Sequence, residues 1–139
     1  MTGHAQLAKF IDRTYGETLQ LLEEARDYSV HDWKEESDHL PAIETIQVNK
    51  ERMRLTARLS VIMAWLMVHK AVSAGEMTPA QAQSDTYHLT AHDVCLPGDS
   101  AEELKLPDRL KRLLNRSFEL YGRVSKMDRM AQRQFAKGV

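Results

Sequence analysis

The residues of this chain best suited to metal chemistry lie together near positions 88 to 95. His88 and His92 are four positions apart and would share one face of a helix, while Asp93 and Cys95 follow closely. Histidine pairs at this helical spacing can chelate zinc, and a thiolate can supply a third ligand. A complete zinc site needs further ligands from a second element, and the other histidines stand singly in the sequence. We therefore expect these residues to bind no metal and the chain to use no cofactor.

Nucleophilic and acid–base chemistry also lack a suitable arrangement. The sequence places no histidine and carboxylate around Cys95 that would activate its thiol. Neighbouring residues on a helix point in different directions, so adjacent carboxylates cannot share one site as general acid and base. The sequence contains no glycine-rich phosphate loop, serine elbow or paired-cysteine motif. We expect a non-enzymatic protein without catalytic residues; the adjacent carboxylates are Glu23 with Glu24, Glu35 with Glu36, and Glu102 with Glu103.

The composition suits one small helical domain covering residues 1–139. Of the 139 residues, 42% are hydrophobic and 28% charged, which provides enough apolar material for a single core. Only six glycines and four prolines occur, which favours packed helices over a turn-rich β fold. The single cysteine cannot form a disulfide within the chain, and the longest nearly apolar run, residues 59–68, is too short to cross a membrane. We expect an all-α cytoplasmic protein with no membrane span.

Apolar residues recur with helical periodicity in three long stretches, which predicts three long helices. Helices of similar length can lie side by side, so the fold class expected is an antiparallel three-helix bundle with a short extra helix between the second and third long helices. The polar stretch over residues 29–41 is expected to be a loop, and residues 131–139 a flexible tail. The predicted helices cover about residues 3–29, from near 43 to 74, about 79–90, and 108 to about 135.

Local signals mark the end of the second helix and the start of the short one. Gly75 can adopt the left-handed conformation that closes a helix. Thr78 is placed as an N-cap, with Pro79 at the first helical position and Gln81 as the second half of a capping box. The sequence therefore predicts a helix stop and a helix start within a few residues.

The second long helix carries two adjacent apolar stripes. One stripe, with Leu59 and Ile62, is expected to face the core. The other contains Val61, Trp65 and Val68, and it either joins the same core or packs on another protein. We interpret Val61, Trp65 and Val68 as a candidate dimer or client interface and expect a homodimer that Trp65→Ala dissociates without loss of helicity.

Charge is unevenly distributed along the chain. Residues 1–40 hold four basic and nine acidic side chains, a net charge of −5, whereas residues 105–139 hold ten basic and three acidic ones, a net charge of +7. The basic helix can lie against the acidic first helix, or it can bind an acidic partner or nucleic acid. We expect Arg123, Arg129 and Arg133 to dock an acidic partner surface. A nucleic-acid-binding helical regulator is the alternative, although the long linkers do not suit a helix-turn-helix reader.

Several segments resemble the RcdA-like family of alphaproteobacteria. The similarity covers roughly residues 7 to 130 and is most specific in the second long helix. The matching segments are Leu-Leu-Glu-Glu-Ala-Arg-Asp-Tyr at 21–28, Arg-Leu-Thr-Ala-Arg-Leu at 54–59, Ala-Trp-Leu-Met-Val at 64–68, Lys-Ala-Val-Ser-Ala-Gly-Glu-Met-Thr at 70–78, and Leu-Tyr-Gly-Arg-Val-Ser-Lys-Met-Asp-Arg at 120–129.

The resemblance implies a dimeric three-helix scaffold for regulated proteolysis. It implies binding to ClpX of the ClpXP protease, primed by a CpdR-type response regulator, and delivery of cargo that includes the cell-cycle regulator CtrA through a cyclic-di-GMP-binding partner. Recruitment to a cell pole is a further expectation. Family adaptors engage the primed protease through a flexible C-terminal extension, whereas only about nine residues follow the matched part here.

Overall fold

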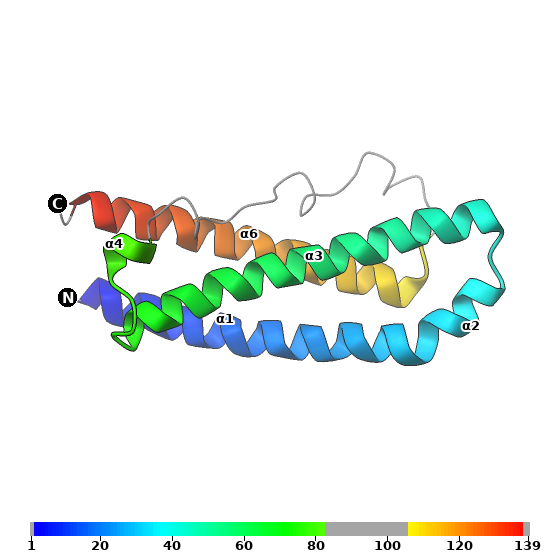
Figure 1. The fold of residues 1–139 in the computed structure, drawn as a ribbon, viewed down its shortest axis with the longest axis horizontal. Helices are drawn as coiled ribbons and strands as arrows, with labels where there is room; N and C mark the ends of the chain where they lie inside the picture. Colours follow the sequence, from blue (N-terminus) through cyan, green and yellow to red (C-terminus); the bar gives the residue numbers. More distant parts are fainter. Residues whose placement is uncertain (1, 83–105, 138–139) are drawn as a thin grey trace.

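Three long helices make up most of the computed structural model, which describes residues 2–82 and 106–137. They are α1 (Thr2–Asp27), α3 (Ala42–Ser73) and α6 (Asp108–Lys137), and each contacts the other two in an elongated bundle (Figure 1). Shorter elements are the π-helical turn η1 (Tyr28–Asp32), α2 (Trp33–Asp38) and α4 (Pro79–Ala82). No strand occurs in the described residues, so the predicted all-α three-helix bundle is confirmed.

The three long helices do not alternate in direction along the chain, as the predicted antiparallel arrangement would require. The indole Nε1 of Trp65 donates to Asp128 Oδ1 at 2.9 Å and Arg58 Nη1 donates to Ser117 Oγ at 2.8 Å, so α3 and α6 run in the same direction. Only α1 is antiparallel to its neighbours, and both termini lie at one end of the bundle (Figure 1). The sequence distance between α4 and α6 allows this, because the 25 residues between them, at about 3.3 Å each, are long enough to span a helix of about 45 Å.

The predicted signals at the end of α3 are confirmed. Gly75 has a φ of 78°, and its N–H donates to the Val72 carbonyl at 3.1 Å while Glu76 N–H donates to the Ala71 carbonyl at 2.9 Å. This pair of hydrogen bonds is a Schellman motif. The next helix begins with the predicted capping box: Gln81 N–H donates to Thr78 Oγ1 at 3.1 Å, and the Thr78 N–H donates back to Gln81 Oε1 at 2.9 Å. The remainder of the predicted short helix lies outside the described residues.

The loop expected over residues 29–41 is wrong for most of its length, because α1 continues through η1 into α2. Tertiary contacts explain this. Tyr28 is buried, and its hydroxyl donates to Glu36 Oε2 at 2.5 Å, which ties α2 to the end of α1. The Arg52 guanidinium of α3 lies 4.1 Å from the Trp33 ring centroid. The contact with Arg52 comes from another helix, and the Tyr28–Glu36 bond spans eight residues, so the turn-forming composition of the stretch did not reveal either.

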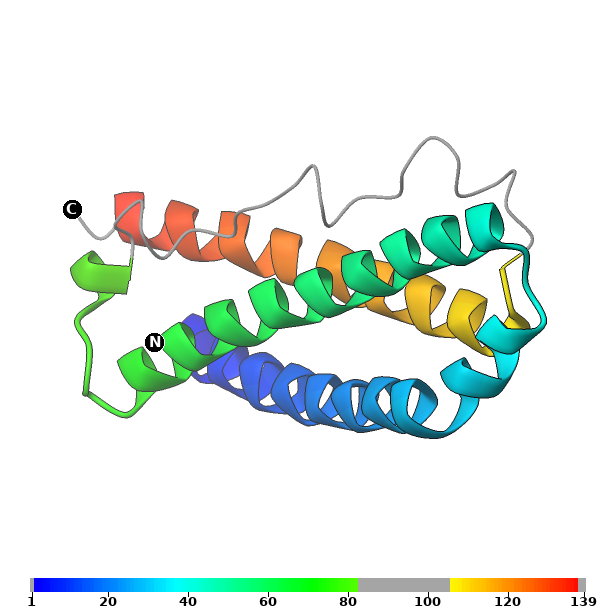
Figure 2. The same ribbon diagram turned by 45° about the vertical axis from the view of Figure 1, so that its right-hand side comes forward.

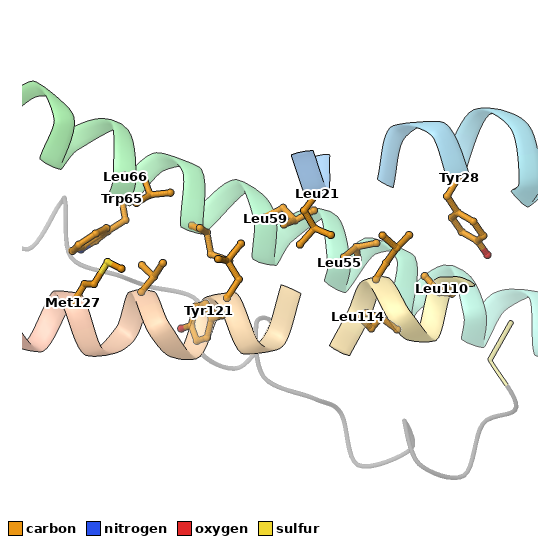
Figure 3. Packing of buried hydrophobic residues seen from close by; sticks show 14 of the residues in the cluster. Leu21, Tyr28, Leu55, Leu59, Trp65, Leu66, Leu110, Leu114, Tyr121 and Met127 are labelled. Carbon is orange, nitrogen blue, oxygen red and sulfur yellow. The ribbon is translucent and has the colours of Figure 1, made fainter. Parts of the chain in front are cut away.

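The core lies along the axis between the three long helices (Figures 2 and 3). α6 and α3 contribute most of the buried hydrophobic side chains, and α1 adds Ile11 and Leu21. Side chains of α3 and α6 interdigitate in Figure 3, with Leu21 and Tyr28 added from the first part of the chain. The fully buried hydrophobic positions include Leu59, Ile62, Leu66, Leu110 and Val124.

The flexible tail expected over residues 131–139 requires correction. α6 extends to Lys137, and Ala131 is buried against the bundle. The heptad-like burial of Val124, Met127 and Ala131 continues the packed side of α6 beyond the segment where the family resemblance ends. The structure therefore provides helical surface, rather than a tail, over the described part of this segment.

Candidate interaction surfaces

The structure places Trp65 inside the bundle rather than on a surface. Its side chain is 2% exposed, points toward α6 near Met127, and donates its indole N–H to Asp128 (Figure 3). The indole also stacks on the buried His69 ring, with 4.0 Å between centroids. The interpretation of Trp65 as an interface residue is therefore corrected to a core role within one chain. Val61 and Val68, the other residues of that stripe, are half-buried.

α3 also exposes apolar side chains on the side that faces away from the core. Met53 is 71% exposed and Met67 is 57% exposed, and between them Thr56, Ser60 and Ala64 are also exposed. These five residues recur every three or four positions, so they form one stripe, which we call the α3 outer face. None of the five carries an ionisable group. The methionines supply adaptable apolar contact area, and the small residues between them leave room for close approach of another chain.

A ladder of ion pairs joins α6 to the acidic first helix. Arg109 donates to Asp27 Oδ2 at 3.0 Å and also pairs with Asp32, and Arg116 pairs with Glu24. Arg123 Nη2 lies 2.5 Å from Glu17 Oε2. The three arginines are seven positions apart, so they lie on one side of α6 and meet carboxylates in the reverse order along α1. We call this ladder the α1–α6 seam.

Mutual hydrogen bonding shifts the titration of the first rung of the seam. The Arg109 guanidinium donates to Asp27 and holds the pKa of that carboxyl below its ordinary value of 3.8. The same bond, with a second that Arg109 donates to Asp32, raises the pKa of Arg109. Both groups are therefore charged at neutral pH. The arginines of the ladder pair with carboxylates of the same chain, which was one of the two alternatives that the charge distribution left open.

The docking residues predicted from the sequence separate into two groups. Arg123 belongs to the α1–α6 seam, so its assignment to a partner surface is corrected. Arg129 and Arg133 are exposed, and neither has an ion pair or hydrogen bond among the interactions of the described residues. Lys126 shares these properties and lies between them and the seam. The C-terminal half of α6 therefore carries three exposed cations that pair with no other described residue.

Sequence reasoning missed a polar cluster inside the bundle. Arg58 is 1% exposed, and its Nη1 donates to the Leu114 carbonyl and to Ser117 Oγ, both at 2.8 Å. Its guanidinium also lies 5.5 Å from the Phe118 ring centroid. Arg58 follows the core residue Leu55 by three positions, and this spacing was the available signal that it faces inward. The cluster fixes the register of α3 against α6.

A second polar cluster closes the end of the bundle at α2. Burial and the hydrogen bond to Glu36 raise the pKa of the Tyr28 hydroxyl, so it remains a donor at physiological pH. Burial also lowers the pKa of Arg52, whose Nη1 donates to Asn49 Oδ1 at 2.8 Å. Together with the contact of Arg52 with Trp33, these bonds hold α2 against α3. The arrangement is a structural clamp and brings no nucleophile and base together.

The residues considered for zinc binding cannot be placed. His88, His92, Asp93 and Cys95 all lie outside the described residues. Within residues 2–82 and 106–137, no group of three histidine, cysteine, aspartate or glutamate side chains is arranged to hold a metal ion. The expectation that the chain binds no metal therefore stays a prediction.

One described helix, α3, is long and apolar enough to cross a membrane when judged by length and composition alone. A core helix of a water-soluble bundle meets the same criterion. α3 has nine buried residues and packs against both α1 and α6, which accounts for its apolar composition. Two of the buried residues, Glu51 and Arg58, are charged and belong to the interior of the bundle.

The three long helices and the buried Arg58 cluster between α3 and α6 define an all-α helical-bundle domain. The family described as "Protein of unknown function (DUF1465)" matches residues 3–138, so the chain belongs to this family. A crystal structure of RcdA from Caulobacter crescentus CB15 is similar to this chain at 35% identity, covering 87% of this chain and 89% of that one with a TM-score of 0.70. The predicted resemblance to the RcdA-like family is thereby confirmed. A comparison with curated proteins finds no match.

Proposed function

We propose that this chain is a non-enzymatic adaptor of the RcdA type, which brings cell-cycle regulators such as CtrA to the ClpXP protease. The observation that carries the proposal is the 35% identity to RcdA over nearly the whole length of both chains. The surfaces are consistent with it, because an adaptor needs a rigid body with separate contact areas. The α3 outer face and the exposed cations of α6 supply two such areas. The proposed location is cytoplasmic, with recruitment to a cell pole through its partners.

A reconstituted degradation reaction tests this role. Purified ClpXP, a CpdR-type response regulator, CtrA and its cyclic-di-GMP-binding partner would be combined with and without this chain, and CtrA would be followed by gel. We expect the chain to accelerate CtrA loss only when the response regulator is present. A CtrA half-life that this chain leaves unchanged, under conditions in which RcdA shortens it, would contradict the proposal.

The adaptor is further proposed to act as a homodimer that pairs through the α3 outer face, with Val61 and Val68 at its margin. Burying methionines at the centre of an interface removes apolar area from water, whereas a charge placed there strongly opposes association. Light scattering should give a dimer for the wild type and a monomer for the double variant Met53→Glu with Met67→Glu. The control is Val30→Glu, at a site 62% exposed on η1, which should remain dimeric. A wild-type monomer at high micromolar concentration would overturn this proposal.

A further inference from the structure

The cations of α6 fall into two groups, those that pair with carboxylates of α1 and those that are exposed to solvent. Arg109, Arg116 and Arg123 form the α1–α6 seam. The next position in this seven-residue repeat is Met130, which is 45% exposed, so the ladder of arginines ends there. Beyond Arg123, the exposed cations Lys126, Arg129 and Arg133 form no ion pair with another described residue.

The exposed cations form a compact stripe over two helical turns. Lys126, Arg129 and Arg133 are exposed and recur at three and four positions, so they lie on one side of α6. Met130 is exposed beside them. The single acid in this part of the helix, Asp128, is half-buried and accepts hydrogen bonds from Trp65 and from Gln132. No carboxylate of α6 therefore neutralises the stripe, which we call the α6 basic stripe.

The N-terminal half of α6 differs. There the exposed cations Lys111 and Arg112 share the surface with the exposed acids Asp108 and Glu119. The positive field is therefore concentrated at the C-terminal half of the helix, at the end of the bundle where both termini lie (Figure 1).

We propose that the α6 basic stripe docks an acidic amphipathic helix of a partner protein. The proposal rests on the proposed adaptor role and names the chemistry of one partner contact. The molecule contains a template for such a contact, because the seam shows how an antiparallel acidic helix pairs with cations of α6. Lys126 and Arg133 are seven positions apart, the same interval as Arg116 and Arg123. A partner helix with carboxylates on one side can meet them in the same manner, with an apolar side chain against Met130.

Size and composition favour an acidic helix over nucleic acid. Protein–DNA complexes commonly make about 6–10 phosphate contacts, whereas this stripe offers three cations along about 10 Å of helix. The arginines of the seam are paired with carboxylates of α1, so they add little to the positive electrostatic potential at the stripe. Met130 at the edge of the stripe suits an apolar contact and offers nothing to a phosphate. An acidic protein segment uses every side chain of the stripe.

The test measures binding of a defined acidic peptide to the full chain. The probe is a fluorescein-labelled helical peptide with glutamates at positions i, i+4 and i+7 and a leucine at i+3, which is the order of the stripe read in the antiparallel direction. A peptide of the same composition with its glutamates distributed around the helix serves as the pattern control, and a duplex DNA is titrated in parallel. Fluorescence anisotropy would be recorded at about 50 mM and about 300 mM salt, between which the Debye length falls about 2.5-fold.

Two triple variants with the same change in charge separate the stripe from the overall field. The stripe variant is Lys126→Glu, Arg129→Glu and Arg133→Glu. The matched control is Lys50→Glu, Lys111→Glu and Arg112→Glu, at exposed positions outside the stripe. Because none of the six side chains forms an ion pair or hydrogen bond with another described residue, both variants should melt within about 2 °C of the wild type.

We expect the stripe variant to weaken binding of the patterned peptide about tenfold at low salt and the control variant by less than about twofold, with the difference shrinking as salt rises. Equal loss in both variants, or equal binding of the two peptides, would overturn the proposal. Tighter binding of duplex DNA that depends on the same three residues would also overturn it, in favour of a nucleic-acid surface. Failure of the ClpXP reaction with intact peptide binding would instead count against the adaptor role alone.

Discussion

Replacement of Trp65 by alanine tests the most consequential assignment in the structure. The indole is 2% exposed, stacks on His69 and donates to Asp128 at 2.9 Å. Truncation of a buried aromatic residue to alanine removes its apolar contacts and leaves a cavity, which costs about 3–5 kcal/mol. Because small domains have a total stability of about 5–15 kcal/mol, we expect Trp65→Ala to remove a large part of the free energy of unfolding. Trp65→Phe keeps most of the ring and should lose about 1–2 kcal/mol, mainly from the hydrogen bond to Asp128.

Urea unfolding followed by circular dichroism measures these differences, at several protein concentrations because dimerisation adds to apparent stability. The control is Met67→Ala, at an exposed position of the same helix, which should change the stability of the monomer by less than about 0.5 kcal/mol. The refuting result is specific. If Trp65→Ala leaves the free energy of unfolding of the monomer unchanged but halves the mass in light scattering, then Trp65 belongs to an interface and the core assignment is incorrect.

Three further predictions concern Arg58, His69 and Gly75. Arg58→Ala should lower the free energy of unfolding by about 3 kcal/mol, because a buried charged donor to α6 and its volume are lost, whereas Arg58→Met fills the space without a buried charge and should cost less than half as much; urea unfolding of both variants compares them. Burial lowers the pKa of His69 below its ordinary value of 6.5, so the unfolded chain binds a proton first; the contribution of His69 to stability is complete above pH 6.5 and is lost as the pH falls below it. The wild type should therefore lose more stability than His69→Gln between about pH 7.5 and pH 5, and parallel pH dependences of the two proteins would contradict the assignment. Gly75→Ala should cost about 1 kcal/mol in thermal melts because its φ is 78°, while Gly16→Ala, within α1 and with open space for a Cβ, should stabilise by about 0.5–1 kcal/mol.

The parts of the fold set by neighbouring residues could be predicted from the sequence. The end of α3 at Gly75 and the cap of α4 at Thr78 are examples. Both were predictable because each motif depends on a few consecutive residues. The existence of the three long helices followed from apolar periodicity in the same way. The continuation of α1 through η1 into α2 could not be found by these criteria. It depends on Tyr28 reaching Glu36 and on Trp33 packing beneath Arg52 of another helix.

The direction in which a helix face points is a different kind of information. Periodicity showed that α3 has apolar residues over more than one side, but the choice between core and surface depends on where α1 and α6 lie. Trp65 belongs to the core because α6 runs parallel to α3 and brings Asp128 beside it. With that side occupied, the surplus apolar area lies at Met53 and Met67. A single sequence does not specify the mutual direction of α3 and α6, so it could not assign these faces.

The pairing of the α6 arginines with α1 could be predicted in part from the sequence. The seven-residue interval of Arg109, Arg116 and Arg123 matches a face that can run along one neighbouring helix, and α1 carries the carboxylates at Asp27, Glu24 and Glu17. Net charge alone treated all the cations of α6 as equivalent. The interval alone does not separate the paired arginines from the unpaired cations, because Lys126 and Arg133 share it; the separation comes from the carboxylates of α1 that lie opposite Arg109, Arg116 and Arg123.

This division of charge allows partner binding and folding to respond differently to salt. The pairs of the α1–α6 seam are solvated, so each contributes little to the stability of the bundle and is weakened by salt. The apolar core between α1, α3 and α6 is not screened and supplies most of the stability. In a contact made through the α6 basic stripe, Met130 is the one apolar side chain of the stripe, so most of the binding free energy is electrostatic. Rising salt should therefore release an acidic partner while the bundle remains folded, so the electrostatic part of docking can be measured on the intact protein.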